Sequence, residues 1–337
     1  MNSKILIIKF SAIGDLVLAT PALRAIKEKF RDSHIAVLVN KESEGILFRC
    51  PYVDELLMYD YKDKDKGVYG FLKLANVLKH KEFDLVIDLQ NNRKSHLLAF
   101  LSASPERYGY DNAKYGFLLN RRIKDRKPLV DPVSHQFQML SMLGINFEDS
   151  HLELWPSEDD QLYIDSFLNS NGLGNSQKLV GINIAASQRW EVKNWPLHHI
   201  ARVCEELSSS GIRVVITGME KDLEIARKLM DATSVAKPII ACGKTTVNQL
   251  ACLIKRCSVY ISPDSAPLHI AASQDTPFVA LFGPTNSSRH LPPAKDYIVI
   301  QKYLPCSPCY SSKCNTRRCM ELITPEDVLE AISRLLK

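Results

Sequence analysis

The residues best suited to chemistry in this chain of 337 residues lie at 262–269, Ser-Pro-Asp-Ser-Ala-Pro-Leu-His. Asp264 and Ser265 are favourable N-cap residues, and Pro267 is favourable in the first turn of a helix. A helix that begins here would direct backbone N–H groups and a partial positive charge at whatever lies in front of it. The segment therefore predicts a binding site for a phosphate or pyrophosphate, with a well-capped connector helix as the alternative.

A second polar segment lies at 185–196, Ala-Ala-Ser-Gln-Arg-Trp-Glu-Val-Lys-Asn-Trp-Pro. Its side chains suited to an anion are a hydroxyl and two cations, Ser187, Arg189 and Lys193. The alternative is a solvated polar loop, in which two tryptophans so close together would be unusual. Further along, Gly218 and Asp222 follow another apolar run. A carboxylate there can hydrogen-bond a ribose diol, or it can simply complement the helix dipole.

Near the N-terminus, Gly14 and Asp15 follow the apolar run 4–9. This segment lacks two of the three glycines of a dinucleotide fingerprint, and it is not a Walker loop. It offers one glycine that permits close approach and one carboxylate at the start of a helix. Asp15 can also be interpreted as a helix cap, and the two roles are compatible.

Strands and helices alternate in the order that would place these residues. Short apolar runs predict strands at 4–9, 34–39, 55–59 and 84–88, and then at 179–184, 212–217, 258–261 and 277–282. Amphipathic patterns predict helices at 16–30, 42–49, 67–80 and 92–102, and then at 158–170, 196–209, 220–232, 246–256, 265–273 and 325–336. This alternation is typical of parallel sheets covered on both faces. The chain is therefore expected to be an α/β protein with two doubly wound domains, and ligands bind such sheets beyond the carboxyl ends of the strands.

The composition is that of an ordinary globular chain, with 45% hydrophobic and 24% charged residues. No apolar run reaches the roughly 18–20 residues of a membrane span. The N-terminus lacks the pattern of a signal peptide, so we expect a cytoplasmic protein. The net charge of +5 permits an anionic partner without demanding one, and we expect no nucleic-acid partner.

Four of the nine cysteines cluster near the C-terminus, Cys306, Cys309, Cys314 and Cys319. The odd total and the expected reducing compartment argue against a disulfide framework. A Cys-x-x-Cys pair has ligand spacing, so a zinc clip is one interpretation. The spacing to the last two cysteines matches no standard finger, and a reduced structural role is favoured.

Several motifs, taken in chain order, resemble the lipopolysaccharide heptosyltransferases, glycosyltransferase family 9. They are Phe10 to Asp15, Thr20 to Leu23, Asp88 to Gln90, Arg189 to Pro196, Asp264 to His269 and Phe282 to Thr285. The resemblance covers nearly the whole chain. It implies a GT-B fold, in which two Rossmann-like domains face an interdomain cleft. The implied boundaries are 1–156 for an acceptor-binding domain, 157–324 for a nucleotide-sugar domain, and 325–337 for a C-terminal helix that could pack back toward the first domain.

The resemblance also implies the reaction and the site. The reaction would be an inverting, metal-independent transfer of L-glycero-D-manno-heptose from ADP-heptose to the inner core on lipid A, without a cofactor. Asp15 would be the general base, and Lys193 would assist departure of the diphosphate. The donor would contact Ser187, Arg189, Lys193, Gly218, Asp222, Asp264, Ser265, Ala266 and His269. The acceptor would contact Ser11, Gly14, Asn92, Arg93, Lys94 and His96.

Some of these implications have alternatives. His269 could be a capping or packing histidine. The basic segment 107–127 could lie against anionic lipid headgroups at the inner membrane, although a solvated face is the default interpretation. At Ala185-Ala186-Ser187 the chain departs from the common family pattern of glycine and further hydroxyls. Other function classes are a nucleotide-sugar epimerase or hydrolase of the same architecture, and a non-catalytic nucleotide-sugar-binding protein.

Overall fold

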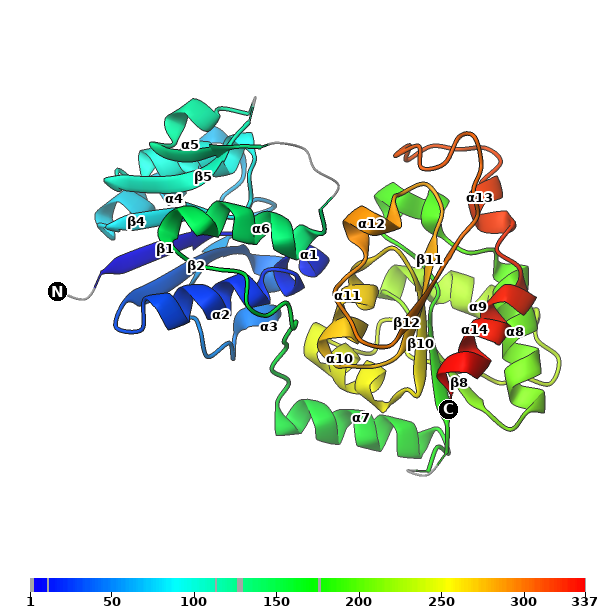
Figure 1. The fold of residues 1–337 in the computed structure, drawn as a ribbon. Helices are drawn as coiled ribbons and strands as arrows, with labels where there is room; N and C mark the ends of the chain where they lie inside the picture. Colours follow the sequence, from blue (N-terminus) through cyan, green and yellow to red (C-terminus); the bar gives the residue numbers. More distant parts are fainter. Residues whose placement is uncertain (1–2, 11, 113, 126–129, 175–176, 337) are drawn as a thin grey trace. The chain divides into compact units, whose positions relative to one another are not determined.

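Strand β1 (Lys4–Ile8) lies inside the first of two parallel six-stranded sheets (Figure 1). Ile7 of β1 pairs with Val37 on one side and with Ile87 on the other, and all three side chains are fully buried. Strands buried in this way on both faces need long apolar runs, as the sequence indicates. The computed structural model describes residues 3–10, 12–112, 114–125, 130–174 and 177–336. It divides the chain into two units, Met1–Trp155 and Pro156–Lys337.

The first unit has the strand order β3-β2-β1-β4-β5-β6. Its remaining strands are β2 (His34–Asn40), β3 (Glu55–Tyr59), β4 (Leu85–Asp88), β5 (Glu106–Asp111) and β6 (Arg121–Lys124). Its helices are α1 (Ile13–Val17), α2 (Thr20–Lys29), α3 (Glu44–Leu47), α4 (Gly67–His80), α5 (Arg93–Leu101) and α6 (Pro132–Leu140). The strand order reverses between β1 and β4, which is where ligands bind in doubly wound sheets.

The second unit repeats this topology, with the order β12-β11-β10-β7-β8-β9. Its strands are β7 (Leu179–Asn183), β8 (Arg213–Thr217), β9 (Ile239–Ile240), β10 (Val259–Pro263), β11 (Phe278–Phe282) and β12 (Tyr297–Gln301). Its helices are α7 (Glu158–Ser170), α8 (Leu197–Ser209), α9 (Leu223–Asp231), α10 (Val247–Arg256), α11 (Ala266–Ser273), α12 (Ser287–His290), α13 (Arg318–Glu321) and α14 (Pro325–Leu335). Here the order reverses between β7 and β10.

Each unit has its own hydrophobic core. In the first unit, Leu6, Leu38 and Val86 lie in one buried cluster. In the second, Val180, Ile261 and Val279 lie in another. The last helix, α14, packs on α8, β11 and β12 of the second unit.

The structure corrects several predicted elements. One helix was expected over 16–30, but α1 ends at Val17 and α2 begins at Thr20, with Pro21 in its first turn. The basic segment 107–127 contains β5 and the short, charged strand β6. The elements β9, β12 and α6 were not predicted. No helix within the described residues is both long enough and apolar enough to cross a membrane.

Candidate active site

A buried ion pair lies beyond the carboxyl ends of β7 and β10. The ammonium Nζ of Lys193 lies 2.6 Å from Oδ2 of Asp264, and it also donates to the Asp264 backbone oxygen at 3.4 Å. Thr285 donates its hydroxyl to the same carboxylate oxygen at 2.7 Å. The face of the Trp190 ring lies 4.6 Å from the ammonium, close enough for a cation–π contact. Asp264 and Trp190 therefore contact the cation directly, and Thr285 holds the carboxylate that pairs with it.

The charge state of Asp264 follows from this pair. Burial alone would raise the pKa of the carboxyl group, but Lys193, His290 and the Thr285 hydroxyl together hold it below its ordinary value. Asp264 is therefore ionised, and its charge is balanced by Lys193. The conformation of the 188–193 segment, a short 3-10 stretch with a kink at Trp190, directs Lys193 inward from an otherwise polar loop.

Beside this pair, hydroxyl groups surround the start of α11. The Asn183 amide at the end of β7 donates to Ser265 Oγ at 3.0 Å and to Ser262 Oγ at 3.3 Å. Ser265 is the N-cap of α11, but its hydroxyl donates to the Pro263 carbonyl and makes no side-chain cap. The side chain that would ordinarily satisfy the first N–H groups of the helix is therefore engaged elsewhere, which suits a helix that receives an anion. His269 is buried one turn further along.

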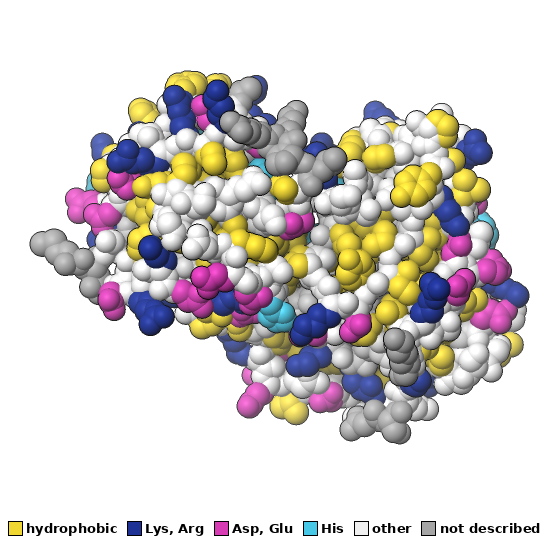
Figure 2. Space-filling model, in the orientation of Figure 1, with side chains coloured by type: hydrophobic (Ala, Val, Ile, Leu, Met, Phe, Trp, Pro, Cys, Tyr) yellow, Lys and Arg dark blue, Asp and Glu magenta, His cyan; other side chains and the backbone are white. Residues whose placement is uncertain are grey.

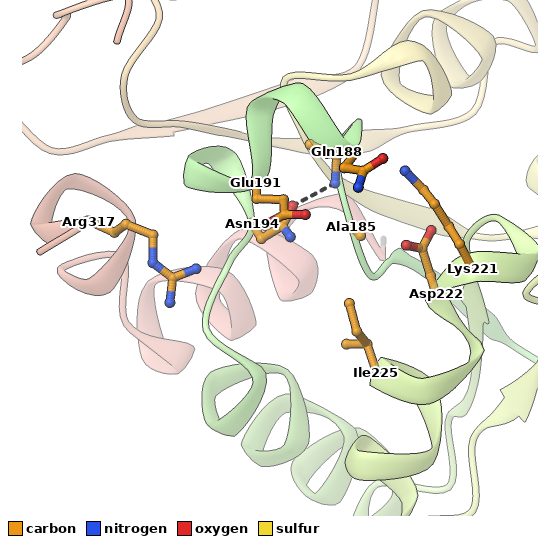
Figure 3. Close-up of a pocket in the computed structure, with 9 residues that line it drawn as sticks. Ala185, Gln188, Glu191, Asn194, Lys221, Asp222, Ile225 and Arg317 are labelled. Atoms are coloured by element: carbon orange, nitrogen blue, oxygen red, sulfur yellow. Dashed lines mark hydrogen bonds between the residues drawn. The ribbon is translucent and has the colours of Figure 1, made fainter. Parts of the chain in front are cut away.

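A pocket of about 300 Å³ lies on the other side of the 185–194 loop (Figure 3). It is lined by Ala185, Ala186, Gln188, Glu191, Asn194, Lys221, Asp222, Ile225 and Arg317. The Asn194 side chain accepts a hydrogen bond from the Ala186 backbone at 2.7 Å and so closes the loop. Asp222 is buried, and its carboxylate accepts from Met219 N at 2.8 Å, which caps the turn before α9.

The backbone at Gly218 packs closely against its neighbours. A Cβ atom at Gly218 would lie 3.0 Å from Ile184, 3.1 Å from the Cys242 sulfur and 3.2 Å from the Asp222 carboxylate. Each of these contacts is closer than most real Cβ contacts, so glycine is the residue that fits. Ser187 and Arg189 lie on the exposed side of the same loop.

In the first unit, Asp15 lies in the first turn of α1 and is exposed. Its Oδ2 accepts from the Ala12 backbone N–H at 3.3 Å, so the capping interpretation holds in this conformation. Exposure leaves the carboxylate accessible to a substrate hydroxyl as well. Gly14 is buried beneath it. Ser11 lies outside the described residues.

The residues after β4 separate into exposed and buried groups. Asn92 caps α5, because its Oδ1 accepts from Lys94 N at 2.9 Å and from Ser95 N at 3.1 Å. Arg93 and Lys94 are exposed, and the Arg93 guanidinium lies 5.7 Å from the centre of the Tyr115 ring. These side chains can meet an acceptor.

His96, which was expected to contact the acceptor, is fully buried in this conformation. Its Nε2 lies 3.4 Å from Asp88 Oδ2, and its Nδ1 bonds the Lys114 carbonyl at 2.8 Å. The other Asp88 oxygen accepts from Gln90 N at 2.9 Å and from Asn91 N at 3.0 Å. Burial raises the pKa of the Asp88 carboxyl group, although His96 opposes this shift. The buried His96–Asp88 pair holds the loop after β4 in place, and it has no exposed surface that a ligand could contact.

The structure thus brings together Lys193, Asp264 and Ser265 at one end of the second sheet. Asn183 and Thr285 support them and were not predicted as site residues. Asn183 could have been found, because it is the single amide in the apolar run Leu-Val-Gly-Ile-Asn-Ile. Arg317, which lies between Cys314 and Cys319 in the sequence, also lines the pocket, and no local sequence signal indicates this.

Comparison with known proteins identifies the family of the chain. Residues 71–319 match glycosyltransferase family 9 (heptosyltransferase). The lipopolysaccharide core heptosyltransferase OpsX of Haemophilus influenzae is 29% identical over 85% of this chain and 80% of its own. Lipopolysaccharide heptosyltransferase 2 of Escherichia coli K12 is 26% identical over 84% of this chain and 83% of its own.

Solved structures show the same architecture. A family 9 glycosyl transferase from Veillonella parvula superposes with a TM-score of 0.88 at 25% identity, covering 100% of this chain and 98% of its own. The Escherichia coli ADP-heptose lps heptosyltransferase II gives a TM-score of 0.80 at 24% identity, covering 99% and 98%.

Two doubly wound Rossmann-like domains of this topology define the GT-B fold class. The family match spans well over half of the chain. The chain therefore belongs to glycosyltransferase family 9, the heptosyltransferase family, and it is a glycosyltransferase.

Proposed function

We propose that this enzyme transfers L-glycero-D-manno-heptose from ADP-heptose to the inner core of lipopolysaccharide, on Kdo-lipid A or a heptosylated acceptor, with inversion and without a metal. The observation that carries the proposal is the buried Lys193–Asp264 pair beside the start of α11. It occurs in a chain similar over most of its length to lipopolysaccharide heptosyltransferases.

For the donor, we assign the diphosphate to Lys193, Ser187, Arg189 and the backbone at Ser265 and Ala266. Arg189 and the helix N-terminus supply positive charge where the leaving group develops negative charge. The Lys193 ammonium, already paired with Asp264, adds an N–H donor rather than a net charge. These groups together are proposed to stabilise the departing diphosphate without a divalent ion. His269 remains assigned to the donor from one turn inside α11.

The structure changes the proposed role of Asp264. A carboxylate repels a diphosphate, and this one accepts hydrogen bonds from Lys193 and Thr285. We therefore assign Asp264 to positioning Lys193. The pocket beside Gly218 and Asp222 is assigned to the nucleoside, with the Asp222 carboxylate beside the ribose.

For the acceptor, we assign Asp15 as the general base. As the bond from the anomeric carbon to the diphosphate breaks, the carbon gains oxocarbenium character, and the acceptor hydroxyl attacks from the opposite face. Asp15 takes the proton of that hydroxyl, a contribution worth about 10²–10⁴-fold. Gly14 would lie beside the attacking hydroxyl, and Asn92, Arg93 and Lys94 would meet the acidic acceptor; Ser11, also expected at the acceptor, lies outside the described residues. His96 is left out of this set because it is buried.

We also propose that the first unit binds anionic membrane surfaces at the cytoplasmic face. Exposed aromatic side chains accompany the basic ones here, namely Phe100, Tyr115 and Phe117. The Arg107 guanidinium lies over Phe100, and that of Arg93 lies over Tyr115. Figure 2 shows hydrophobic and basic side chains together at the upper edge of this unit, where α5 lies in Figure 1. Aromatic and basic residues together are typical of membrane interfaces.

The decisive experiment incubates the protein with ADP-heptose and defined Kdo-lipid A acceptors, with and without a first heptose, and identifies the products by mass. Transfer yields an acceptor heavier by one heptose, together with ADP. Consumption or isomerisation of the donor without any acceptor would instead indicate the epimerase or hydrolase. Donor binding without turnover would indicate a non-catalytic protein. Sedimentation with anionic and with neutral vesicles tests the membrane proposal separately.

A further inference from the structure

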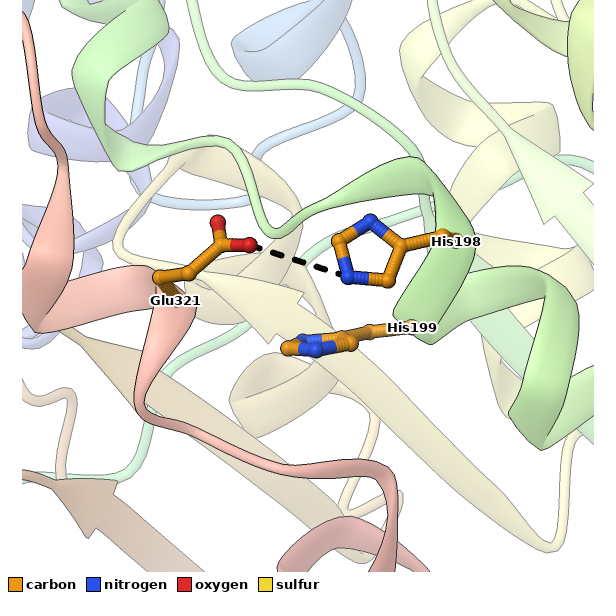
Figure 4. Close-up of side chains that lie close together, drawn as sticks. All are labelled: His198, His199 and Glu321. Carbon is orange, nitrogen blue, oxygen red and sulfur yellow. Dashed lines mark ion pairs between the residues drawn. The ribbon is translucent and has the colours of Figure 1, made fainter.

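Two histidines and a glutamate meet on the surface of the second unit (Figure 4). His198 and His199 lie in the first turn of α8, and Glu321 is the last residue of α13. One ligand atom from each side chain can be chosen so that all three lie within 4.8 Å of one another. The His198 Nε2 atom is 3.6 Å from Glu321 Oε1. Residues more than 120 positions apart in sequence thus direct three donor groups at one point.

The backbone beneath these side chains is fixed. The Trp195 indole, just before α8, donates to the Ile323 carbonyl, just after α13, at 2.8 Å, and this hydrogen bond is buried. Met320 and Ile323 are fully buried in the core. The two segments that carry the ligands are therefore held against each other before any ion binds, which is what a metal site requires of its scaffold.

His199 has the surroundings of an oriented ligand. The Ile323 carbonyl interacts with its ring, and a backbone carbonyl is a common outer partner of metal-bound histidine. The His198 and His199 rings lie 4.2 Å apart. An exposed pair of His198 with Glu321 would contribute little stability alone and would not need His199 beside it.

We propose that His198, His199 and Glu321 form a binding site for a divalent transition ion of the zinc type, which links α13 to α8. Two imidazoles and one carboxylate suit Zn²⁺, with water in the fourth position. Tetrahedral Zn²⁺ with bonds of about 2.0–2.1 Å places its ligand atoms about 3.4 Å apart. His198 and Glu321 have side chains that are 68% and 48% exposed, so they can close the remaining distance. The donor group contains no cysteine, although Cys319 of the cysteine cluster lies two residues before Glu321 in α13.

The test uses the full-length protein freed of metal with EDTA and then titrated with Zn²⁺ against a chromophoric competitor, with Co²⁺ as a spectroscopic probe. We expect one equivalent to bind at this site. We expect His198→Ala and Glu321→Gln each to weaken that equivalent by about tenfold or more. Both residues are exposed, so neither substitution threatens folding. His80→Ala, an exposed histidine on α4, is the matched control and should bind as the wild type does.

The same Co²⁺ probe distinguishes binding at this site from binding at the cysteine cluster. Co²⁺ held by nitrogen and oxygen shows visible bands without a thiolate charge-transfer band in the near ultraviolet. We expect Zn²⁺ to raise the thermal midpoint of the wild type and of Cys309→Ser, but not that of His198→Ala. The proposal is overturned if His198→Ala and Glu321→Gln bind as tightly as His80→Ala. It is also overturned if the bound equivalent shows thiolate charge transfer and disappears in Cys309→Ser.

Discussion

Lys193 and Asp264, 71 positions apart in sequence, form an ion pair of 2.6 Å in which the two side chains are only 11% and 7% exposed. A pair this buried is costly to disturb, because removing one partner leaves the other as an isolated charge. It also leaves the lysine ammonium with almost no freedom to move. The pair therefore links the stability of the second unit to the position of the cation that we assign to the diphosphate.

Asp264→Ala should destabilise the second unit by about 3–5 kcal/mol, because Lys193 then remains buried without its counter-ion. Urea unfolding followed by circular dichroism measures this. Asp231→Asn, an exposed acid at the end of α9, is the control and should change stability by less than about 0.5 kcal/mol. Equal midpoints for the two variants would contradict the role of the pair.

The same pair predicts a pH dependence. The pKa of Asp264 is depressed in the folded protein, so its contribution is present above the unfolded value of about 3.9 and is lost as the pH falls through the folded value. The stability difference between wild type and Asp264→Asn should therefore shrink in the acid range below about pH 4. A difference that stays constant down to pH 2 would argue against an ionised Asp264.

Lys193→Ala should lower kcat by about 10²–10³-fold, which is the usual cost of removing one preorganised electrostatic donor, and should also weaken donor binding. A structural effect can be separated from this loss with the double variant Lys193→Met/Asp264→Leu, which removes both buried charges together. If the double variant is as stable as the wild type but has the same low activity as Lys193→Ala, the lysine acts in the reaction. Normal turnover in the double variant would remove Lys193 from the mechanism.

Asp15→Asn should lower kcat by about 10²–10⁴-fold with little change in stability, because the side chain is exposed and the amide oxygen can still cap α1. The measurement is initial rate with saturating ADP-heptose and acceptor, beside the thermal midpoint. Asp32→Asn, another exposed acid of the first unit, is expected to keep wild-type activity. Comparable rates in the two variants would show that Asp15 is only a cap.

Two substitutions of Asp88 should differ in their effect on the free energy of unfolding. Asp88→Asn keeps an oxygen for the Gln90 and Asn91 N–H groups, so we expect a change within about 1 kcal/mol. Asp88→Ala orphans both N–H groups and should cost about 1–3 kcal/mol for each. Unfolding free energies in urea measure both changes.

The pKa of the Asp88 carboxyl group is raised in the folded protein, so the native state keeps a proton that the unfolded state releases. Wild-type stability should therefore fall relative to Asp88→Asn as the pH rises above about 3.9. The opposite slope would mean that His96 outweighs the effect of burial.

Buried apolar strands were the most predictable part of the fold. Runs such as His34–Asn40 and Leu179–Asn183 were predicted almost to their ends, because strands covered on both faces require continuous apolar sequence. The charged edge strand Arg121–Lys124 was missed because it lacks such an apolar run. Basic residues on an edge strand discourage pairing with another chain, and they leave no apolar pattern in the sequence. Tyr297–Gln301 has that signal and could have been predicted.

The candidate site was predictable where sequence neighbours act together, and not where the fold brings distant residues together. The start of α11 was predicted from Ser265 and Pro267, because residue preferences at the start of a helix are local, although the Ser265 side chain makes no capping hydrogen bond. The contact of Asp264 with Lys193 depends on the pairing of β7 with β10, which no spacing reveals. The burial of His96 against Asp88 is likewise a result of packing, and the sequence pattern of α5 left its orientation open.

The repeated strand order has a consequence for denaturation. Because each half of the chain encloses its own apolar interior, heating need not melt both halves together, and a calorimetric scan can contain two overlapping transitions. A nucleotide held only by the C-terminal half would raise the midpoint of one transition and leave the other unchanged. Nucleotide titration by calorimetry would therefore assign each peak to its half of the molecule.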